Sequence, residues 1–457
     1  MRVIICGAGR VGVGIARRLA HENNEVTVID QDRDLVRIVV ERYDVRGIVG
    51  NGAFPETLEE AGAREADMLI AVTYSDEVNM IACQVAHTLF NVPTKIARIR
   101  AQGFLDSRYS DLYSRTNLPI DVIISPEREV SHAIIERLAT PGAFEVKTFA
   151  EGRVWAVGVK LREDCAIINT PLRQVAELFP DLKITIVGVR REENLWRAHS
   201  EDQLQVGDQI FFVAERSNVS RALEIMGAAL SQARRIILVG GGNIGLFVAK
   251  GLERIGGAKI RLIERDRERA EIIAEELERT IVLQGDGLDR AILREAGVAE
   301  AHTVVAVTDN DQVNILTSVV GKREGSRRSM ALINDRDYGP ISEAVGVDRF
   351  VDPRATTIST VLQHVRRGRI KGVYSLFDGA AELIDAVALE TSPLVNKPLS
   401  EANLPEGVII GAIVREDEVL MPAGDTVIKV GDRVVLMALR ESVKEVEQMF
   451  RVSIEFF

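Results

Sequence analysis

The strongest constraint on the fold of this chain is a glycine-rich segment that occurs twice. The first copy is MRVIICGAGRVGVGIARRLAHENNEVTVID, in which an apolar run leads into Gly7-x-Gly9-x-x-Gly12 and then into apolar residues at helical spacing. A second apolar run follows and ends at Asp30. This order predicts a strand, a glycine turn, a helix, a second strand and an acid, as in a dinucleotide-binding unit. One GxGxxG turn is a weak signal, because a tight turn that binds nothing has the same pattern.

Each residue of the motif has a physical role in such a unit. Gly7 allows a sharp turn out of the strand, Gly9 lets a pyrophosphate approach the backbone, and Gly12 lets the helix pack closely on the strand. The free N–H groups at the start of the helix would face the phosphates. Asp30 would accept a hydrogen bond from a ribose hydroxyl and repel a 2′-phosphate, which favours NAD or NADH over the phosphorylated cofactor.

The second copy begins at Arg235 and contains Gly240-Gly-Gly-Asn-Ile-Gly245, followed by the acid Glu264. Matched residues in the two copies are separated by 233 to 235 positions; the pairs include Gly7 with Gly240, Asp30 with Glu264, Gly62 with Gly297, Thr73 with Thr308 and Asn79 with Asn314. Such a constant spacing indicates internal duplication, which makes a functional role of the motif much more probable than a single copy would.

The pattern between these landmarks predicts the fold class. Strands and helices alternate with short connections over residues 1–140 and again over 234–368, which predicts two doubly wound, parallel α/β sheets of the Rossmann-like kind. Each is followed by a small α+β domain, at 141–216 and 369–457. A connector helix is predicted within 217–233, over Val219 to Leu230. The small domains also repeat: Val206-Gly207-Asp208 matches Val430-Gly431-Asp432, and Val189-Arg190 matches Val414-Arg415.

Composition excludes several classes of protein. The net charge of −11 argues against a general nucleic-acid-binding surface, so we expect no nucleic acid as partner. No apolar run approaches the eighteen or so residues of a membrane span, and the start of the chain does not resemble a signal peptide, so a cytosolic protein is expected. The three cysteines lie far apart and the six histidines lack metal-ligand spacing, which predicts neither disulfides nor a metal site.

The chain lacks a recognisable catalytic constellation. A dehydrogenase needs an acid or base beside its substrate pocket, and neither small domain shows such a group, a nucleophile or a metal cluster. The favoured interpretation is therefore that the nucleotide is a regulatory ligand and not a reagent. No catalytic residue is predicted. The alternative is an NAD-dependent oxidoreductase with a diverged catalytic domain.

The two predicted sites differ in charge. Arg10 lies inside the first glycine loop, and Arg98 and Arg100 follow a strand whose end would face the phosphates, where guanidinium groups could bind them bidentately. The alternative for Arg98 and Arg100 is a surface salt bridge. The corresponding residues of the second copy are Asn243, Leu332 and Asn334. The first site should therefore bind phosphate-rich ligands more tightly.

These tandem motifs, with the Ala-Val-Thr strand ends at Thr73 and Thr308 and the small domains that follow, resemble potassium-conductance-regulating (RCK or KTN) domains. The duplicated arrangement of domains over the whole chain resembles that of the peripheral subunit of the bacterial and archaeal Trk potassium-uptake system. The resemblance implies a cytosolic gating ring, a homotetramer docked on the inner face of a membrane potassium-translocating subunit. It also implies binding of NAD or NADH, and in some members of ATP or ADP.

The resemblance carries the binding residues onto this sequence as follows. They are Gly7, Ala8, Gly9, Arg10, Val11, Gly12, Asp30, Thr73, Tyr74 and Arg98 in the first copy, and Gly240, Gly241, Gly242, Asn243, Ile244, Gly245, Glu264, Thr308 and Asp309 in the second.

Overall fold

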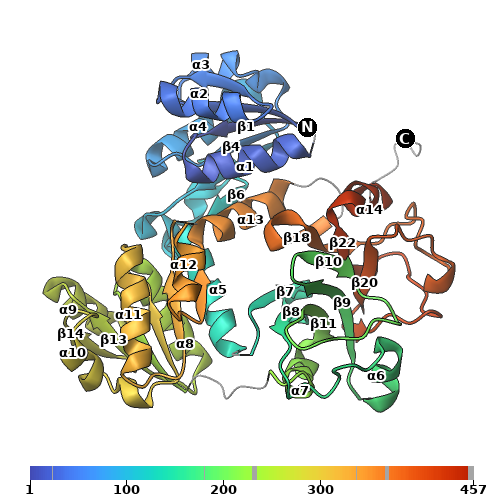
Figure 1. The fold of residues 1–457 in the computed structure, drawn as a ribbon. Helices are drawn as coiled ribbons and strands as arrows, with labels where there is room; N and C mark the ends of the chain where they lie inside the picture. Colours follow the sequence, from blue (N-terminus) through green and yellow to red (C-terminus); the bar gives the residue numbers. More distant parts are fainter. Residues whose placement is uncertain are drawn as a thin grey trace. The chain divides into compact units, whose positions relative to one another are not determined.

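The structure is a computed structural model that describes residues 1–22, 24–140, 142–179, 181–228, 234–335, 337–365 and 370–450. The chain divides into two compact units, Met1–His132 with Ile236–Val365 and Ala133–Arg235 with Arg366–Phe457. The first unit contains both predicted nucleotide-binding domains and the second contains both small domains (Figure 1). The domain limits given above remain a prediction.

The first nucleotide domain is a six-stranded parallel sheet in the order β3-β2-β1-β4-β5-β6. Its elements are β1 (Arg2–Cys6), α1 (Arg10–His21), β2 (Glu25–Asp30), α2 (Arg33–Arg42), β3 (Arg46–Val49), α3 (Pro55–Glu60), β4 (Met68–Ala71), α4 (Asp76–Phe90), β5 (Thr94–Arg98), β6 (Val122–Ile124) and α5 (Pro126–Ala139). All of β4 is buried, as expected for a strand covered by helices on both faces. The strand order reverses between β1 and β4, so the loops that follow these two strands meet at the position where such sheets bind ligands.

The second nucleotide domain has the same strand order, β14-β13-β12-β15-β16-β17. Its elements are β12 (Arg235–Val239), α8 (Asn243–Ile255), β13 (Lys259–Glu264), α9 (Arg267–Glu276), β14 (Ile281–Gln284), α10 (Arg290–Glu295), β15 (Thr303–Ala306), α11 (Asp311–Arg323), β16 (Ser329–Leu332), α12 (Tyr338–Ala344), β17 (Arg349–Val351) and α13 (Pro353–Val365). The predicted duplication is thus confirmed strand by strand. The copies differ between their last two strands, where the first has the short turns Gln102–Leu105 and Ser107–Tyr113 and the second has α12.

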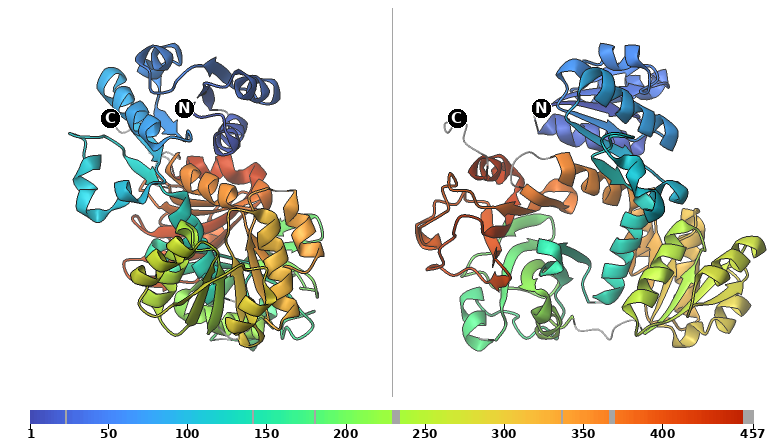
Figure 2. Two further views of the ribbon diagram at one scale, coloured as in Figure 1. Left: turned by 90° about the vertical axis from the view of Figure 1, so that its left-hand side faces the viewer. Right: turned by 180° about the vertical axis from the view of Figure 1, so that it is seen from behind.

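The last helix of the second nucleotide domain packs on the first. Val361 and Val365 of α13 are buried in one core with Ile15 and Leu19 of α1, and Figures 1 and 2 show α13 (orange) against α1 (blue). Gly14 permits this approach, because a Cβ at that position would collide with Ile358.

The packing between the two domains is reciprocal, since α5 of the first domain packs on α8 of the second. The Ser131 hydroxyl, which donates to the Glu127 carbonyl of its own helix (2.6 Å), also lies 3.2 Å from the Ile244 carbonyl. The Arg128 guanidinium lies over the Phe247 ring. Each glycine-loop helix therefore has a helix of the other copy as its neighbour.

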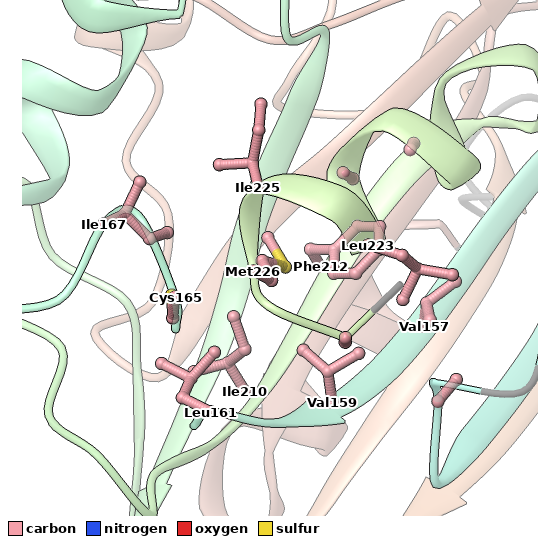
Figure 3. Packing of buried hydrophobic residues seen from close by; sticks show 14 of the residues in the cluster. Val157, Val159, Leu161, Cys165, Ile167, Ile210, Phe212, Leu223, Ile225 and Met226 are labelled. Atoms are coloured by element: carbon pink, nitrogen blue, oxygen red, sulfur yellow. The ribbon is translucent and has the colours of Figure 1, made fainter. Parts of the chain in front are cut away.

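The first small domain is a five-stranded antiparallel sheet in the order β10-β9-β11-β8-β7. Its elements are β7 (Glu145–Phe149), β8 (Val154–Lys160), α6 (Leu172–Leu178), β9 (Ile184–Arg191), β10 (Asn194–Arg197), β11 (Gln209–Glu215) and α7 (Val219–Ile225). Figure 3 shows its core, where Phe212 of β11 meets Leu223 of α7 and Met226.

One prediction for this region is wrong. The connector helix expected over Val219–Leu230 ends at Ile225, because Gly227 adopts a left-handed conformation (φ +66°). The helix is also part of the small domain's core, with Val219 and Ala222 buried. Residues 229–233 of the predicted connector lie outside the described residues.

The second small domain repeats the first, with the order β18-β19-β22-β20-β21. Its elements are β18 (Ile370–Leu376), β19 (Ala381–Val387), β20 (Val408–Arg415), β21 (Glu418–Leu420), β22 (Arg433–Leu439) and α14 (Val443–Met449). The two sheets share a core that includes Phe211, Val213, Leu383 and Met437.

The structure corrects the alignment of the small domains by one residue. Asp208 and Asp432 hold equivalent ion pairs, but the partner of Asp208 is Arg191, whereas that of Asp432 is Arg415. Arg415 therefore corresponds to Arg191 and not to Arg190. Two consecutive arginines, Arg190 and Arg191, allow either alignment in the sequence, and the ion pairs decide between them.

Candidate functional site

The first glycine loop has the geometry that its sequence predicts. Gly7 has φ +112°, a conformation that favours glycine, and a Cβ on Gly12 would collide with the Gly7 carbonyl oxygen. Gly9 differs, because nothing lies within 4 Å of the position that its Cβ would occupy. Two of the glycines are therefore required by the fold, and the third leaves room for a ligand.

Asp30 holds this loop from the end of β2. Its Oδ2 accepts a hydrogen bond from the Ala8 N–H (2.6 Å) and its Oδ1 accepts one from the Asp32 N–H (2.9 Å). Each carboxylate oxygen can accept a further bond, so the side chain remains able to accept one from a ribose hydroxyl.

A fully buried asparagine fixes the neighbouring strand end. Asn79 Oδ1 accepts hydrogen bonds from both the N–H (2.8 Å) and the hydroxyl (2.7 Å) of Thr73. Its amide nitrogen donates to the Thr73 carbonyl (3.2 Å) and to the Arg98 carbonyl (2.9 Å). Asn79 thereby joins the end of β4 to the end of β5. In the sequence Asn79 is visible only as a marker of the repeat, and its recurrence as Asn314 is the signal for this role.

Asp76 is a second residue whose role the sequence analysis missed. Its carboxylate accepts hydrogen bonds from the Arg100 N–H (2.9 Å) and the Ala101 N–H (2.7 Å), which fixes the chain after β5. Its counterpart Asp311 does the same for Asn334 and Asp335, both at 2.9 Å. Asp30, Asn79 and Asp76, with the backbone groups that they bind, form the frame of the first site, and Glu264, Asn314 and Asp311 form that of the second.

The two arginines after β5 have different environments. Arg98 donates from Nη2 to the Thr73 carbonyl (2.7 Å), while its buried Nε has no hydrogen-bond partner among the described residues. Burial lowers the pKa of Arg98, and the nearby positive charge of Arg100 lowers it further. Arg100 instead forms an ion pair with Glu127 (2.9 Å), and this hydrogen bond raises the pKa of Arg100. The salt-bridge alternative therefore describes Arg100, whereas Arg98 retains an unpaired donor.

These residues surround a cavity of about 680 Å³, a size typical of ligand sites. The predicted residues that line it are Gly7, Gly9, Arg10, Val11, Asp30, Thr73, Tyr74 and Arg98, together with Ile244, which was predicted for the second site. Ala8 and Gly12 do not line it and act on the loop itself. The side chain of Tyr74 is 87% exposed, and Arg100 lies over its ring.

Several walls of this cavity were not predicted. Leu35 of α2 provides an apolar wall, and Pro353, Arg354 and Thr357 come from α13 of the other nucleotide domain. The first site is thus completed by the second copy. Sequence spacing does not indicate that α13 lines the first cavity, because this depends on the packing of the last helix of one domain against the other domain.

The second glycine loop has the same frame. Gly240 has φ +108°, a Cβ on Gly245 would collide with the Gly240 carbonyl, and the position of a Gly242 Cβ is open. Glu264 accepts hydrogen bonds from the Gly241 N–H (2.6 Å) and the Asp266 N–H (2.8 Å).

The strand end of this copy is also the same, with Thr308 bound to Asn314 Oδ1 through both its N–H (2.8 Å) and its hydroxyl (2.7 Å). Leu332 occupies the place of Arg98, since its carbonyl accepts the corresponding bond from Asn314 (2.9 Å).

The second site departs from the first on the side of Glu264. Arg269, which corresponds to Leu35, donates from Nε to the Gly241 carbonyl (2.8 Å) and so covers the loop. The cavity here is about 690 Å³ and is lined by Gly242, Asn243, Ile244, Thr308 and Asp309. Arg10 and Arg100 of the first domain also line this cavity. Of the described residues predicted for the second site, Gly240, Gly241, Gly245 and Glu264 do not line it.

No group of three or more His, Cys, Asp or Glu side chains among the described residues could hold a metal ion. No described helix is both long enough and apolar enough to cross a membrane. Cys6, next to the first site, is buried, which raises the pKa of its thiol to about 12.

Comparison with known families identifies both kinds of domain. The TrkA-N domain matches residues 3–126 and 236–353, and the TrkA-C domain matches 156–227 and 383–451. The Trk system potassium uptake protein TrkA of Azorhizobium caulinodans is 52% identical over the whole length of both chains. The proteins of the same name from Halomonas elongata and Vibrio alginolyticus are each 38% identical, over 100% and 99% of both chains.

Solved structures show the same fold at low identity. The GsuK RCK domain is 19% identical, with a TM-score of 0.60 over 98% of this chain and 94% of that one. A GsuK channel described as bound to NAD is 17% identical, with a TM-score of 0.60 over 98% of this chain and 78% of that one. The similarity shows that the tandem RCK fold is present here.

Proposed function

Because the chain belongs to the TrkA family of Trk-system potassium uptake proteins, we propose that it is a regulatory subunit that binds a nucleotide at its first site and thereby gates potassium uptake through a membrane potassium-translocating subunit. The family consists of transport proteins and not of enzymes, which confirms the prediction that the chain is not an enzyme. No contact described above favours the oxidoreductase alternative.

The observation that carries the proposal is the first cavity. Its glycine loop is open at Gly9, Asp30 has capacity to accept a bond from a ribose, and Arg98 has a buried, unpaired N–H group. An unpaired buried donor costs stability unless a partner satisfies it, and a phosphate oxygen is a suitable partner. The proposed ligand is NAD or NADH, with ADP and ATP as alternatives that use the same loop.

Ligand binding can control a partner only by favouring one conformation over another, usually by about 1–3 kcal/mol. The first cavity is suited to this, because it is lined by α1 of one nucleotide domain and by α13 of the other. A ligand there contacts both domains. In the proposed mechanism it changes the angle between them, and this change is transmitted to the membrane subunit.

Exposed apolar side chains support assembly into a ring. Ile81 on α4 is 47% exposed and its counterpart Leu316 on α11 is 51% exposed. The two residues occupy the same position after the Ala-Val-Thr strand ends, and Leu89, Ile341 and Val345 add to the exposed apolar surface on these helices and α12. Burial of these residues between copies would form a homo-oligomer, proposed to be a tetramer on the cytoplasmic face of the membrane.

Small-angle scattering of the purified full chain, alone and with NADH, ADP or ATP, tests this proposal. We expect at least one nucleotide to change the scattering profile, and the Asp30→Ala variant to lose that change. If the scattering profiles with NADH, ADP and ATP are all identical to that of the chain alone, gating by a nucleotide is contradicted. Potassium flux into vesicles that contain the translocating subunit should follow the same ligand dependence.

A further inference from the structure

The N-terminus of α13 is held firmly against the first cavity. Asp352 caps the helix by accepting hydrogen bonds from the N–H groups of Arg354 (2.8 Å) and Ala355 (3.1 Å). Thr357, one turn later, is 1% exposed and its hydroxyl donates to the Pro353 carbonyl (2.8 Å). The backbone that carries Arg354 is therefore well fixed.

The rest of the helix anchors this end to the first nucleotide domain. Val361 and Val365 are buried in the core of that domain, and Ile358 packs where Gly14 has no side chain. The Thr360 hydroxyl lies between two acceptors, the Thr356 carbonyl of its own helix (3.1 Å) and the Glu129 carboxylate of α5 (3.4 Å). Arg354 is thus placed beside the first glycine loop, although it belongs to the other copy, and it lines the same cavity as Gly9 and Arg10.

The repeat shows that this arginine is a difference between the two sites. Pro353 and Arg354 begin α13, whereas the corresponding helix α5 begins with Pro126 and Glu127. Glu127 is paired with Arg100, so these two charges largely cancel. The positive side chains left at the first cavity are Arg10, Arg98 and Arg354.

The ligands under consideration differ in their phosphates. In a dinucleotide both phosphates are esterified, whereas ADP and ATP end in a terminal phosphate that carries additional negative charge and exposed oxygens. A guanidinium group recognises such oxygens bidentately and charge-assisted bonds are the stronger ones.

We propose that Arg354 is a specificity-determining residue of the first site, which binds the terminal phosphate of a nucleoside diphosphate or triphosphate and discriminates it from a dinucleotide. This inference rests on the function proposed above. Since Arg354 comes from the second nucleotide domain, a mononucleotide bound in this way connects the two domains by a contact that NAD or NADH does not make.

Calorimetric titration of the full chain with ADP and with NADH tests the proposal in the Arg354→Gln variant. We expect ADP binding to weaken by about tenfold or more, the loss of one charge-assisted bond, and NADH binding to change by less than about threefold. Arg354→Lys, which keeps the charge, should restore part of the affinity for ADP. Arg254→Gln, at an exposed arginine in the last turn of α8, is the matched control and should change neither.

Each other outcome has a definite meaning. Equal weakening of ADP and NADH would show that Arg354 contributes only general attraction, and unchanged ADP binding would show that it does not contact the ligand; both overturn the inference and leave the proposed function intact. If the unchanged chain binds neither nucleotide, the proposed function is wrong and the inference falls with it. Unfolding curves that match those of the parent exclude a folding defect.

Discussion

In the first nucleotide domain the glycine loop lies beside Leu35, Arg10 and Arg98, whereas in the second the corresponding residues are Arg269, Asn243 and Leu332. Beneath these side chains the frame is the same. The acid after the second strand binds the loop amide at 2.6 Å in both copies, and the buried asparagine holds the threonine hydroxyl at 2.7 Å in both.

The comparison separates what builds the loop from what selects the ligand. The frame uses backbone groups and buried polar side chains, which remain satisfied without any nucleotide. The side chains that line the cavities differ in charge, and Arg269 covers the second loop where Leu35 leaves the first one accessible. We therefore expect the first site to bind nucleotides strongly and the second to bind them weakly or to select different ones.

The largest expected effect tests the shared frame. Gly12→Ala and Gly245→Ala should each destabilise their own domain by about 3 kcal/mol or more, because the new Cβ collides with a backbone carbonyl that cannot move aside. Urea unfolding measures this. Gly9→Ala is the control: its Cβ meets no protein atom, so stability should stay within about 0.5 kcal/mol while nucleotide binding is lost. A stable Gly12→Ala variant would show that the loop is not built as described.

The next effect converts part of the first site into the second. Arg98→Leu, which copies Leu332, should weaken ADP or NADH binding by about tenfold, because it removes the guanidinium group of a residue that lines the cavity, together with its buried, unpaired Nε. Titration at several salt concentrations should also show a smaller salt dependence than in the parent. Arg100→Gln should weaken binding less, since Arg100 is already paired with Glu127. If Arg100→Gln has the larger effect, the distinction between the two arginines is wrong.

The smallest effect tests the closure of the second site. Arg269→Leu, which copies Leu35, removes the bond to the Gly241 carbonyl and should strengthen nucleotide binding at the second loop by a few-fold, on the order of one lost competing hydrogen bond. The measurement is best made in the Asp30→Ala background, where the first site is weakened. Arg267→Leu, at an exposed arginine of the same helix paired with Glu271, serves as the control. Unchanged binding in Arg269→Leu would show that this side chain does not restrict the second site.

Much of the fold could be predicted from the sequence because its signals are local. Glycines, capping residues and apolar runs fix where strands and helices begin and end, as in the strand, glycine turn and helix that begin each copy and that the structure shows as β1 with α1 and β12 with α8. The duplication supplied the topology twice. The error at Val219–Leu230 had a local cause, since Gly227 ends the helix although apolar residues continue beyond it.

Only part of the candidate site could be predicted from the sequence. The glycine loops and Asp30 could be recognised, because their spacing reflects backbone geometry. The position of Arg354 at the first cavity could not be recognised, since it depends on α13 packing against a domain that lies more than two hundred positions earlier in the chain. Nor could spacing show that Arg100 is paired with Glu127, or that Arg269 covers the second loop, because these are tertiary contacts between long side chains.

The most direct test of the account is calorimetric titration of the full chain with NADH, comparing Asp30→Ala with Glu264→Ala. The two substitutions remove the same bond to a loop amide, so their effects on loop geometry are matched. We expect Asp30→Ala to abolish the tight binding and Glu264→Ala to leave it nearly unchanged. Equal losses in the two variants, or a loss confined to Glu264→Ala, would contradict the claim that the first site is the principal nucleotide sensor.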